Sequence, residues 1–411
     1  MKRYSFYNDV IRKGAAVMLL TVLLHCSIYG QDFYDEYLSS SELDSVWKKS
    51  ENGQKVAALY SFIGNNIKAI HWYSHSRKVK IGREDIINRI KGAENYFKPM
   101  DDFYDILSDE KIVIFNEAHH LPRHRVFVTG LLPKLKKMGY NYIGFEGLTP
   151  NYQDTTRTMM DTLLRDRGYP IVSGYSGYYI KEPQFGNLIR SAIQSGFRIF
   201  GYEKGPSGIP RERKQAQNIA RVLAQDPDAR IVIFCGYDHL IEKDTIKLND
   251  QYPDFTYMAG YLKKMTDIDP LTVNQVILSD YLLPGYNIYY DHLEFKEEMF
   301  VSSKDLYGID SLKYDYLVYH PRTKYNNGRP DWVKQQGYKY VDITDRLDRE
   351  RLPCVVRAVK LDEKINAVPM DIIEVQKDAM SQGILVLPIG KYNVYLRYDD
   401  NSKDHFEIHV K

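Results

Sequence analysis

The residues best equipped for chemistry lie in one short stretch, Asn116-Glu117-Ala118-His119-His120. This stretch directly follows Ile112–Phe115, an apolar run typical of a buried strand. One carboxylate and two imidazoles are costly to bury unless they have partners or a purpose. A carboxylate beside an imidazole, which titrates near neutral pH, can activate a water molecule. We therefore predict that this stretch begins an active or binding site.

Three further predicted strands also end at polar side chains. Tyr140–Phe145 precedes Glu146, Phe197–Tyr202 precedes Glu203, and Ala229–Cys235 precedes Gly236-Tyr237-Asp238-His239. Helical periodicity separates these strands, at His124–Met138, Gly186–Ser195 and Ile209–Gln225. Strands that alternate with helices run parallel, and their carboxyl ends form the ligand-binding edge of the sheet. The first two strands form a βαβ unit, so we expect Glu146 beside Glu117, His119 and His120.

The whole pattern predicts an α/β fold with a mainly parallel sheet and helices on both faces. We assign residues 106–350 to this core, 31–105 to a helical N-terminal segment and 353–411 to a small, β-sandwich-like antiparallel domain. Further strands are predicted at Phe255–Tyr261, Val273–Leu278 and Tyr314–His320, and a helix at Asn151–Arg167. The long loop Gly168–Phe185 carries four tyrosines, and loops of this length usually form lids or binding walls.

The N-terminus predicts export. Met1–Gly30 combines basic residues, the short apolar run Ala15–Leu24 and small residues near Gly30, as in a secretory signal peptide. We expect a secreted or periplasmic protein, with a lipoprotein at Cys26 the less favoured alternative. No later stretch is long and apolar enough to span a bilayer. Of the remaining cysteines, Cys235 lies in an apolar run and is expected to be a buried free thiol.

Composition narrows the functional class. The formal net charge of +2 gives no reason to expect nucleic acid or an anionic membrane as a partner. The chain has no glycine-rich strand–helix turn for a nucleotide and no G-x-S-x-G elbow for a serine hydrolase. The 35 tyrosines suit the walls of a polar cleft, although they also fit a compositional habit. We expect a small-molecule substrate; oligomeric state is not readable from the sequence.

Four motifs resemble the erythromycin-esterase-like superfamily, which includes the ChaN-type haem-binding lipoproteins and the Tiki/TraB membrane metalloproteases. They are NEAHH at 116–120, FEG at 145–147, RERKQAQN at 211–218 and CGYDHL at 235–240. The first resembles G-E-x-x-H through Glu117 and His120, whereas in the haem-binding branch the histidine would be His119. In the first motif, Asn116 replaces the glycine of G-E-x-x-H. In the third, Glu212 and Gln215 replace the aspartate and methionine of the family's R-D-x-x-M-A-x-N. The resemblance covers about residues 111–280.

The resemblance implies a hydrolase that cleaves an ester, lactone or amide bond. His119 or His120 would activate water, with Glu117 and Glu146 holding it, and His239 would orient substrate or stabilise negative charge. Arg211 would add positive potential; the alternative is a surface ion pair with Glu212 or Asp226. Glu203, Tyr237 and Asp238 complete the expected substrate-binding residues, although Glu203 could instead pair with Arg213.

Two other interpretations stay open. In the first, one of the adjacent histidines, Glu146 and His239 hold a divalent metal that activates water. In the second, the protein is not an enzyme and binds haem through a histidine between tyrosine walls. The residues alone do not decide between no cofactor, a metal and haem.

Overall fold

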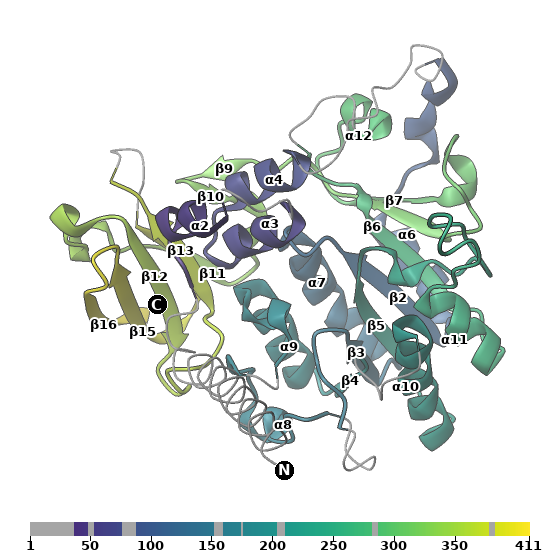
Figure 1. Ribbon diagram of the computed structural model, residues 1–411, viewed down its shortest axis with the longest axis horizontal. Helices are drawn as coiled ribbons and strands as arrows, with labels where there is room; N and C mark the ends of the chain where they lie inside the picture. The colour runs from purple at the N-terminus through teal and green to yellow at the C-terminus, as the bar shows by residue number, and fades with distance from the viewer. Residues whose placement is uncertain are drawn as a thin grey trace, which may run out of the picture. The chain divides into compact units, whose positions relative to one another are not determined.

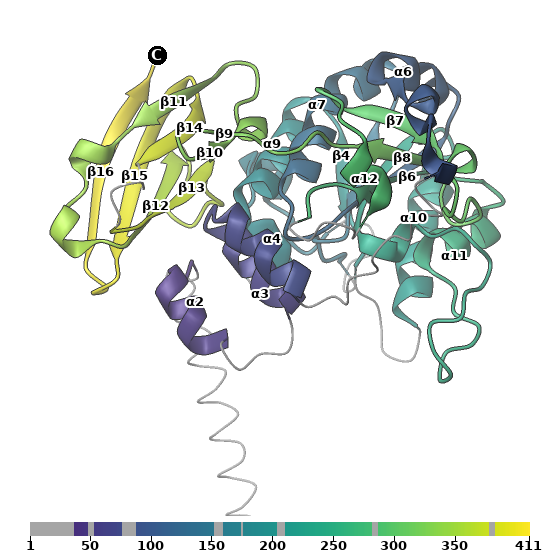
Figure 2. The same ribbon diagram turned by 90° about the horizontal axis from the view of Figure 1, so that it is seen from above.

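Figures 1 and 2 show the computed structural model of the protein. It describes residues 37–47, 53–75, 88–151, 159–173, 176–203, 210–281, 287–377 and 383–411. The predicted signal peptide lies outside these residues. No helix in the described part of the chain has the length and apolar character needed to cross a membrane.

An eight-stranded sheet forms the centre of the fold, in the order β1-β7-β8-β6-β2-β5-β3-β4. Strands β2, β3, β4, β5, β6 and β8 are parallel, and β7 runs antiparallel to β1 and β8. The bounds are β1 Lys98–Pro99, β2 Ile112–Glu117, β3 Tyr142–Phe145, β4 Arg198–Gly201, β5 Ile231–Gly236, β6 Leu271–Leu278, β7 Met299–Ser302 and β8 Tyr316–Tyr319. The prediction of a mainly parallel sheet is confirmed.

Helices cover both faces of this sheet, as predicted (Figures 1 and 2). Residues of α10 (Arg211–Gln225) and α11 (Met258–Thr266) share a hydrophobic core with Ile112 and Ile114 of β2. The alternate residue Phe115 packs toward α7 (Arg123–Lys137), through an edge-on contact with Phe127. Because side chains alternate along a strand, Glu117 also lies on the α7 face. The α9 helix (Pro183–Gln194) packs beside α7.

The order of the strands corrects one expectation. Strands β2 and β3 are parallel, but they are not neighbours, because β5 lies between them and pairs with both. All six residues of β5, IVIFCG, are buried, and such a continuous apolar run suits a strand with neighbours on both sides. Gly236 at the end of β5 therefore separates the ends of β2 and β3.

Two predicted elements are wrong in the described residues. The segment predicted as a strand at Phe255–Tyr261 gives way to α11, whose Met258, Ala259 and Leu262 share one buried helical face. The helix predicted at Asn151–Arg167 is reduced to α8, Leu164–Arg167, and the preceding Leu163 is 63% exposed. Residues 152–158 within that prediction lie outside the described residues.

Short helices and strands complete the first 350 residues. Within the predicted helical N-terminal segment, α3 and α4 are separated at Gly64, which has a positive φ of 72°. The bounds are α2 Ser40–Trp47, α3 Gly53–Phe62, α4 Asn66–His75, α6 Met100–Ser108, α12 Ile288–His292, β9 Tyr325–Asn326, β10 Arg329–Pro330 and β11 Tyr338–Asp342. Single 3₁₀ turns are η2 Ala93–Tyr96, η3 Tyr178–Lys181, η4 Tyr237–Leu240, η5 Ser303–Asp305, η6 Asp331–Val333, η7 Thr344–Arg346 and η8 Arg349–Arg351.

The C-terminal strands form two small antiparallel sheets, as the alternating sequence predicts. One has the order β13-β12-β15-β16, and the other pairs β14 with β11. The bounds are β12 Cys354–Lys360, β13 Asp371–Val375, β14 Ile384–Pro388, β15 Gly390–Tyr398 and β16 Lys403–Val410. The two sheets share one hydrophobic core. Cys354 and Cys235 are both buried and free, which confirms the free thiol expected at Cys235.

Candidate functional site

Glu117 is fixed at the end of β2 by a buried arginine. Arg125, on the first turns of α7, contacts both carboxylate oxygens of Glu117, at 2.5 Å (Nε–Oε2) and 2.8 Å (Nη2–Oε1). A third nitrogen of the guanidinium donates to Glu182 at 2.8 Å. Burial would raise the pKa of Glu117, but the charge of Arg125 and the hydrogen bond from His119 lower it. Glu117 is therefore an ionised, immobile acceptor.

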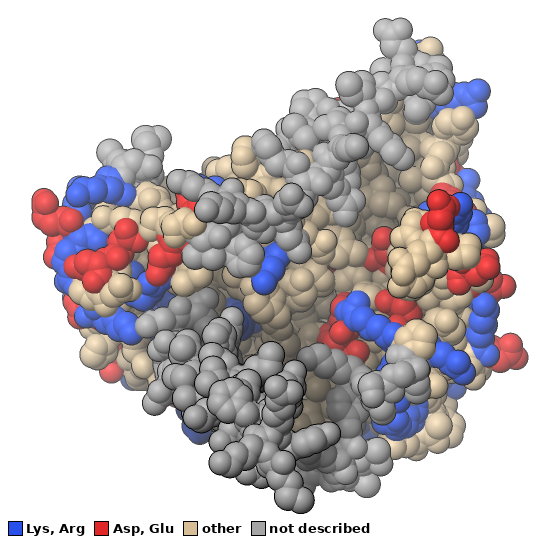
Figure 3. All heavy atoms as spheres, viewed as in Figure 1, with Lys and Arg blue, Asp and Glu red and all other residues tan. Residues whose placement is uncertain are grey.

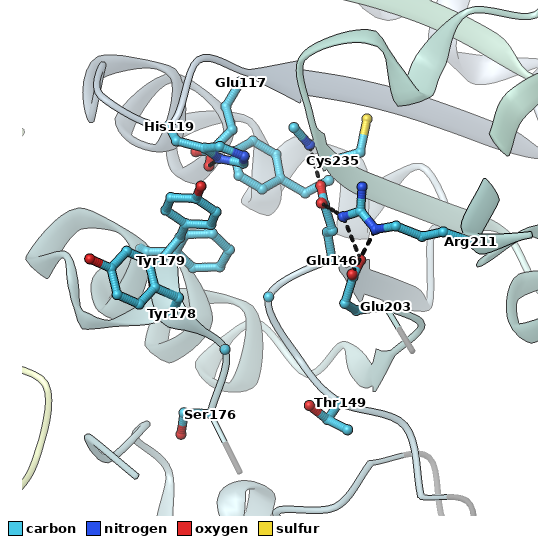
Figure 4. A pocket seen from close by; sticks show the side chains of 15 residues that line it. Glu117, His119, Glu146, Thr149, Ser176, Tyr178, Tyr179, Glu203, Arg211 and Cys235 are labelled. Carbon is cyan, nitrogen blue, oxygen red and sulfur yellow. Dashed lines mark hydrogen bonds and ion pairs between the residues drawn. The ribbon is translucent and has the colours of Figure 1, made fainter. Parts of the chain in front are cut away.

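His119 is held on two sides. Its Nδ1 lies 2.8 Å from Glu117 Oε1, and its ring stacks on Tyr179 with centroids 3.6 Å apart. Because the ionised Glu117 only accepts, the Nδ1 atom carries a proton, and in the neutral ring Nε2 is then the nitrogen with the lone pair. Figure 4 shows the imidazole lying over Tyr179, with its far edge turned toward Glu146. Burial, followed by the charges of Glu146 and Glu117, raises the pKa of Tyr179 to about 12, so this phenol stays neutral.

Glu146, at the end of β3, anchors a second network. It accepts from Arg211 Nη2 at 2.5 Å and from the backbone N–H of Gly236, and it lies 3.3 Å from His239 Nε2. Burial would raise the pKa of Glu146, but the charge of His239, the hydrogen bond from His239 and the charge of Arg211 lower it. This carboxylate is thus ionised and, like Glu117, already has partners.

Glu203 and Arg211 continue this network. Arg211 donates to both oxygens of Glu203, at 2.8 Å and 2.9 Å, and Gln215 Nε2 donates to Glu203 at 2.6 Å. The three alternative ion pairs are replaced by others: Glu212 pairs with His239, Asp226 with Arg198, and Glu203 with Arg211. Burial and the charge of Glu146 raise the pKa of Glu203.

His239 lies behind Glu146, between two carboxylates. Its Nδ1 is 2.7 Å from Glu212 Oε2, and Glu212 also accepts the N–H of Met258 at 2.9 Å. Arg211 Nη1 also lies 2.9 Å from His239 Nε2. The Nε2 atom can donate to Glu146 or accept from Arg211, but it cannot do both. Burial would lower the pKa of His239, but Glu146 and Glu212 raise it to about 10. We therefore describe His239 as an imidazolium that donates to both glutamates.

This charge makes stability depend on pH. A histidine titrates near 6.5 when unfolded, so His239 contributes its full stabilisation below that pH and loses it as pH rises to about 10. Wild-type free energy of unfolding should therefore fall more steeply between these pH values than that of His239→Gln. Urea denaturation at a series of pH values measures both slopes. Parallel slopes would contradict an imidazolium at this position.

Gly236 is the point at which the two networks meet. A Cβ at this position would lie 2.4 Å from His119 Cε1 and 3.1 Å from Glu146 Oε2. The backbone φ of −84° is open to any residue, so the glycine is needed for space. Side chains from β2 and β3 can meet over the intervening β5 because its last residue has no side chain.

Gly236→Ala is expected to destabilise the protein by about 1–3 kcal/mol, the usual cost of overpacking. It should also displace His119 or Glu146. The matched control is Gly130→Ala on α7, where an added Cβ has nothing within 4 Å. That change should stabilise the helix by about 0.5–1 kcal/mol. Thermal unfolding of both variants measures the difference, and equal effects would show that Gly236 is not constrained.

A cavity of about 240 Å³ opens between the two networks (Figure 4). Its described lining is Glu117, His119, Glu146, Gly147, Thr149, Ser176, Gly177, Tyr178, Tyr179, Phe185, Glu203, Arg211, Phe234, Cys235 and Gly236. Tyr178 and Tyr179 come from the predicted tyrosine-rich loop, of which residues 174 and 175 lie outside the described residues. Glu117 and His119 thus lie with the tyrosine rings on one side of the cavity, and Glu146, Glu203 and Arg211 lie on the other (Figure 4).

The structure divides the predicted site residues. Glu117, His119, Glu146, Glu203 and Arg211 line the cavity, whereas four others are not part of its described lining, namely His120, Tyr237, Asp238 and His239. The ring of His120 stacks on Tyr73 of α4, 3.8 Å away. Asp238 is exposed and contributes to the raised pKa of Tyr257, after burial.

Sequence reasoning missed two charged residues that build the site, Arg125 and Glu182, and it named Glu212 only as a motif position and a possible partner of Arg211. All three are buried: Arg125 and Glu182 hold Glu117 in place, and Glu212 holds His239. Arg125 lies on α7, the helix that follows β2. A basic residue so soon after Glu117 in the sequence could have been predicted as its ion-pair partner. Glu182 precedes Pro183 and caps α9 by accepting the N–H of Phe185 at 2.9 Å.

The donor groups do not fit a metal ion. Among the described residues, no group of three or more His, Cys, Asp and Glu side chains is arranged to hold a metal ion. The carboxylates of Glu117 and Glu146 face Arg125 and Arg211, whose charges repel a cation. For haem, the nitrogen of His119 left to ligate iron is Nε2, because Nδ1 is committed to Glu117 and Tyr179 covers one face of the ring. We derive no chemical step through either group.

Charges on the surface are mixed in sign. The face in Figure 3 shows basic and acidic side chains close together, without one large area of either sign. This agrees with the net charge of +2. The surface seen there therefore offers no extended basic region of the kind that binds a nucleic-acid backbone.

No known family and no curated protein matches the chain. Among solved structures it is similar to the type III effector HopBA1, with 10% identity, a TM-score of 0.34 and coverage of 59% of this chain and 97% of that one. A Bacillus cereus protein has 11% identity, a TM-score of 0.40 and coverage of 60% and 99%. ChaN of Campylobacter jejuni, described with cofacial haem binding, has 13% identity, a TM-score of 0.30 and coverage of 54% and 92%. Similarity at this level carries no argument about chemistry, so function must be argued from the site.

Proposed function

We propose that this protein is a hydrolase in which His119 activates water to cleave an ester, lactone or amide bond. The observation that carries the proposal is the Glu117–His119 pair, joined at 2.8 Å beside the cavity. An imidazole that donates through Nδ1 keeps the Nε2 lone pair as a general base. The carboxylate orients the ring and stabilises the imidazolium formed when the base takes a proton.

The surrounding charges support this assignment. Arg125 locks Glu117 from the buried side, so the orienting carboxylate cannot turn away from His119. Arg211 supplies the positive charge in the described cavity lining, and its side chain is 49% exposed. Positive charge near a carbonyl stabilises the oxyanion that forms when water attacks. Tyr178, Tyr179 and Phe185 offer apolar ring surfaces for the rest of the substrate.

A panel of p-nitrophenyl esters, lactones and aryl amides tests the proposal with the protein as it exists. We expect turnover of at least one member of the panel, lost in His119→Asn and retained in His120→Asn. Pre-incubation with EDTA should leave the rate unchanged, because His119 acts without a metal. Turnover that survives His119→Asn would refute the assigned base. A rate abolished by EDTA and restored by a divalent metal would support the metal interpretation instead.

A further inference from the structure

Tyr237 has a backbone conformation that aromatic residues rarely adopt. Its φ is +41°, directly after Gly236 at the end of β5. The other described non-glycine residues with positive φ are Asp267, Asn327 and Asn401, which are types that tolerate this region. Backbone strain of this kind persists where surrounding contacts enforce it, and it often occurs at functional sites.

The contact that enforces it comes from β2. Asn116 Nδ2 donates to the carbonyl oxygen of Tyr237 at 2.7 Å. Asn116 is itself fixed by β6, because its Oδ1 accepts the N–H of Gln275 at 2.7 Å. Gln275 Nε2 also donates to the backbone carbonyl of Asn116, at 2.7 Å. Asn116, 1% exposed, therefore links its own strand β2 to β6 on one side and to the residue that follows β5 on the other.

The strained conformation places the Tyr237 ring between the two histidines. The ring is perpendicular to the imidazole of His119, with centroids 4.9 Å apart. It lies parallel to Tyr73, 6.1 Å away, and its Oη is 3.4 Å from His120 Nδ1. Tyr237 does not belong to the described lining of the cavity, so its effect on a reaction there would pass through His119.

We propose that Tyr237, held in its left-handed conformation by Asn116, is a positioning residue that fixes the ring of His119. The inference rests on the proposed function, in which His119 is the base. A single hydrogen bond at Nδ1 leaves the imidazole able to tilt out of line with Glu117, which weakens the contact that selects the Nδ1–H tautomer. Tyr179 restrains only one face of the ring. The ring of Tyr237 blocks the tilt from the end of a central strand and keeps Nε2 directed at the cavity.

Strain at Tyr237 is tested by comparing Tyr237→Ala with Tyr237→Gly. Both remove the ring, but only glycine adopts a positive φ freely, so the Gly variant should be more stable than the Ala variant. We expect unfolding constants that differ by roughly fivefold to thirtyfold. Tyr395, within strand β15, is the matched control: there the Ala variant should be the more stable by about two- to fivefold. The same order at both positions would refute enforced strain at Tyr237.

A double-mutant cycle tests the role of Asn116. In the wild-type background, Asn116→Ala removes the hydrogen bond that holds Tyr237. In the Tyr237→Gly background that bond no longer enforces an unfavourable conformation, so the destabilisation by Asn116→Ala should be smaller. Additive effects of the two changes on urea unfolding would contradict the coupling.

Positioning itself is tested by kinetics and by NMR. Using a p-nitrophenyl ester turned over by the wild type, Tyr237→Ala and Tyr237→Gly should lower kcat about 10- to 100-fold and leave KM within about threefold. Tyr237→Phe, which keeps the ring, should retain kcat. The ¹⁵N spectrum of His119 should show the Nδ1–H tautomer in wild type and Tyr237→Phe, and a mixture of tautomers in Tyr237→Ala.

The two proposals fail in different ways. An unchanged kcat and an unchanged His119 tautomer in Tyr237→Ala would overturn the positioning role while the hydrolase proposal stands. If the wild type cleaves nothing in the panel but the tautomer still changes in Tyr237→Ala, the hydrolase proposal fails and the positioning of His119 is supported.

Discussion

Replacing His119 with asparagine is expected to lower kcat about 10²- to 10⁴-fold, the usual contribution of a general base. The change removes the Nε2 lone pair and preserves most of the volume beside Tyr179. KM should change little, because the apolar walls that would bind substrate stay in place. Steady-state kinetics on an ester cleaved by the wild type measure both parameters.

His120 is the matched control, since it is the next residue and the same side chain. It is buried against Tyr73 and is not part of the described cavity lining. His120→Asn should keep kcat within about tenfold of wild type, since the base is intact, and lower stability through lost ring packing. If His120→Asn loses activity and His119→Asn keeps it, the assignment of the two histidines must be exchanged.

Arg125→Met is expected to destabilise the protein by about 3–5 kcal/mol, the usual cost of removing one partner from a buried ion pair. The guanidinium is fully buried and pairs with Glu117 and Glu182, so methionine leaves two buried carboxylates without a counter-charge. Urea denaturation monitored by circular dichroism measures the loss. Activity should fall too, because Glu117 is no longer held against His119.

Arg198→Met provides the comparison for Arg125→Met. Arg198 pairs with Asp226 at 2.9 Å, but its side chain is 57% exposed. Water screens such a pair, so the midpoint of unfolding should hardly change. If both arginine variants lost the same stability, burial of the Arg125 network would not be its source.

Local sequence pattern was enough to predict the strands and helices that carry the site. The apolar run before Glu117 is β2, and the runs before Glu146, Glu203 and Tyr237 are β3, β4 and β5, each within a few residues of the predicted bounds. The alternating C-terminal strands were equally readable. The strands of the parallel sheet and the C-terminal strands were both predicted from the spacing of apolar residues along the chain, which a single sequence displays directly.

The pattern failed where an apolar segment fitted two structures. Phe255–Tyr261 is short and rich in aromatic residues, which is typical of a strand. In the structure, however, Met258 and Leu262 lie on one helical face that packs against α10. That choice depends on a partner 40 residues away in sequence. Similarly, the position of β5 between β2 and β3 is decided when the sheet assembles, and it cannot be predicted from the sequence of the βαβ unit alone.

The sequence by itself determined that acids and histidines lie at four strand ends on one edge of a sheet. Only the tertiary structure decided which of them face the same cavity. His119 and His120 are adjacent in the chain, yet one lies on Tyr179 in the cavity wall and the other on Tyr73. His239 and Tyr237 are not part of the described cavity lining: His239 contacts Glu146 and Tyr237 contacts His119. The reason is that side-chain direction at a strand end depends on packing partners such as Arg125, Glu212 and Asn116, and on the space left by Gly236.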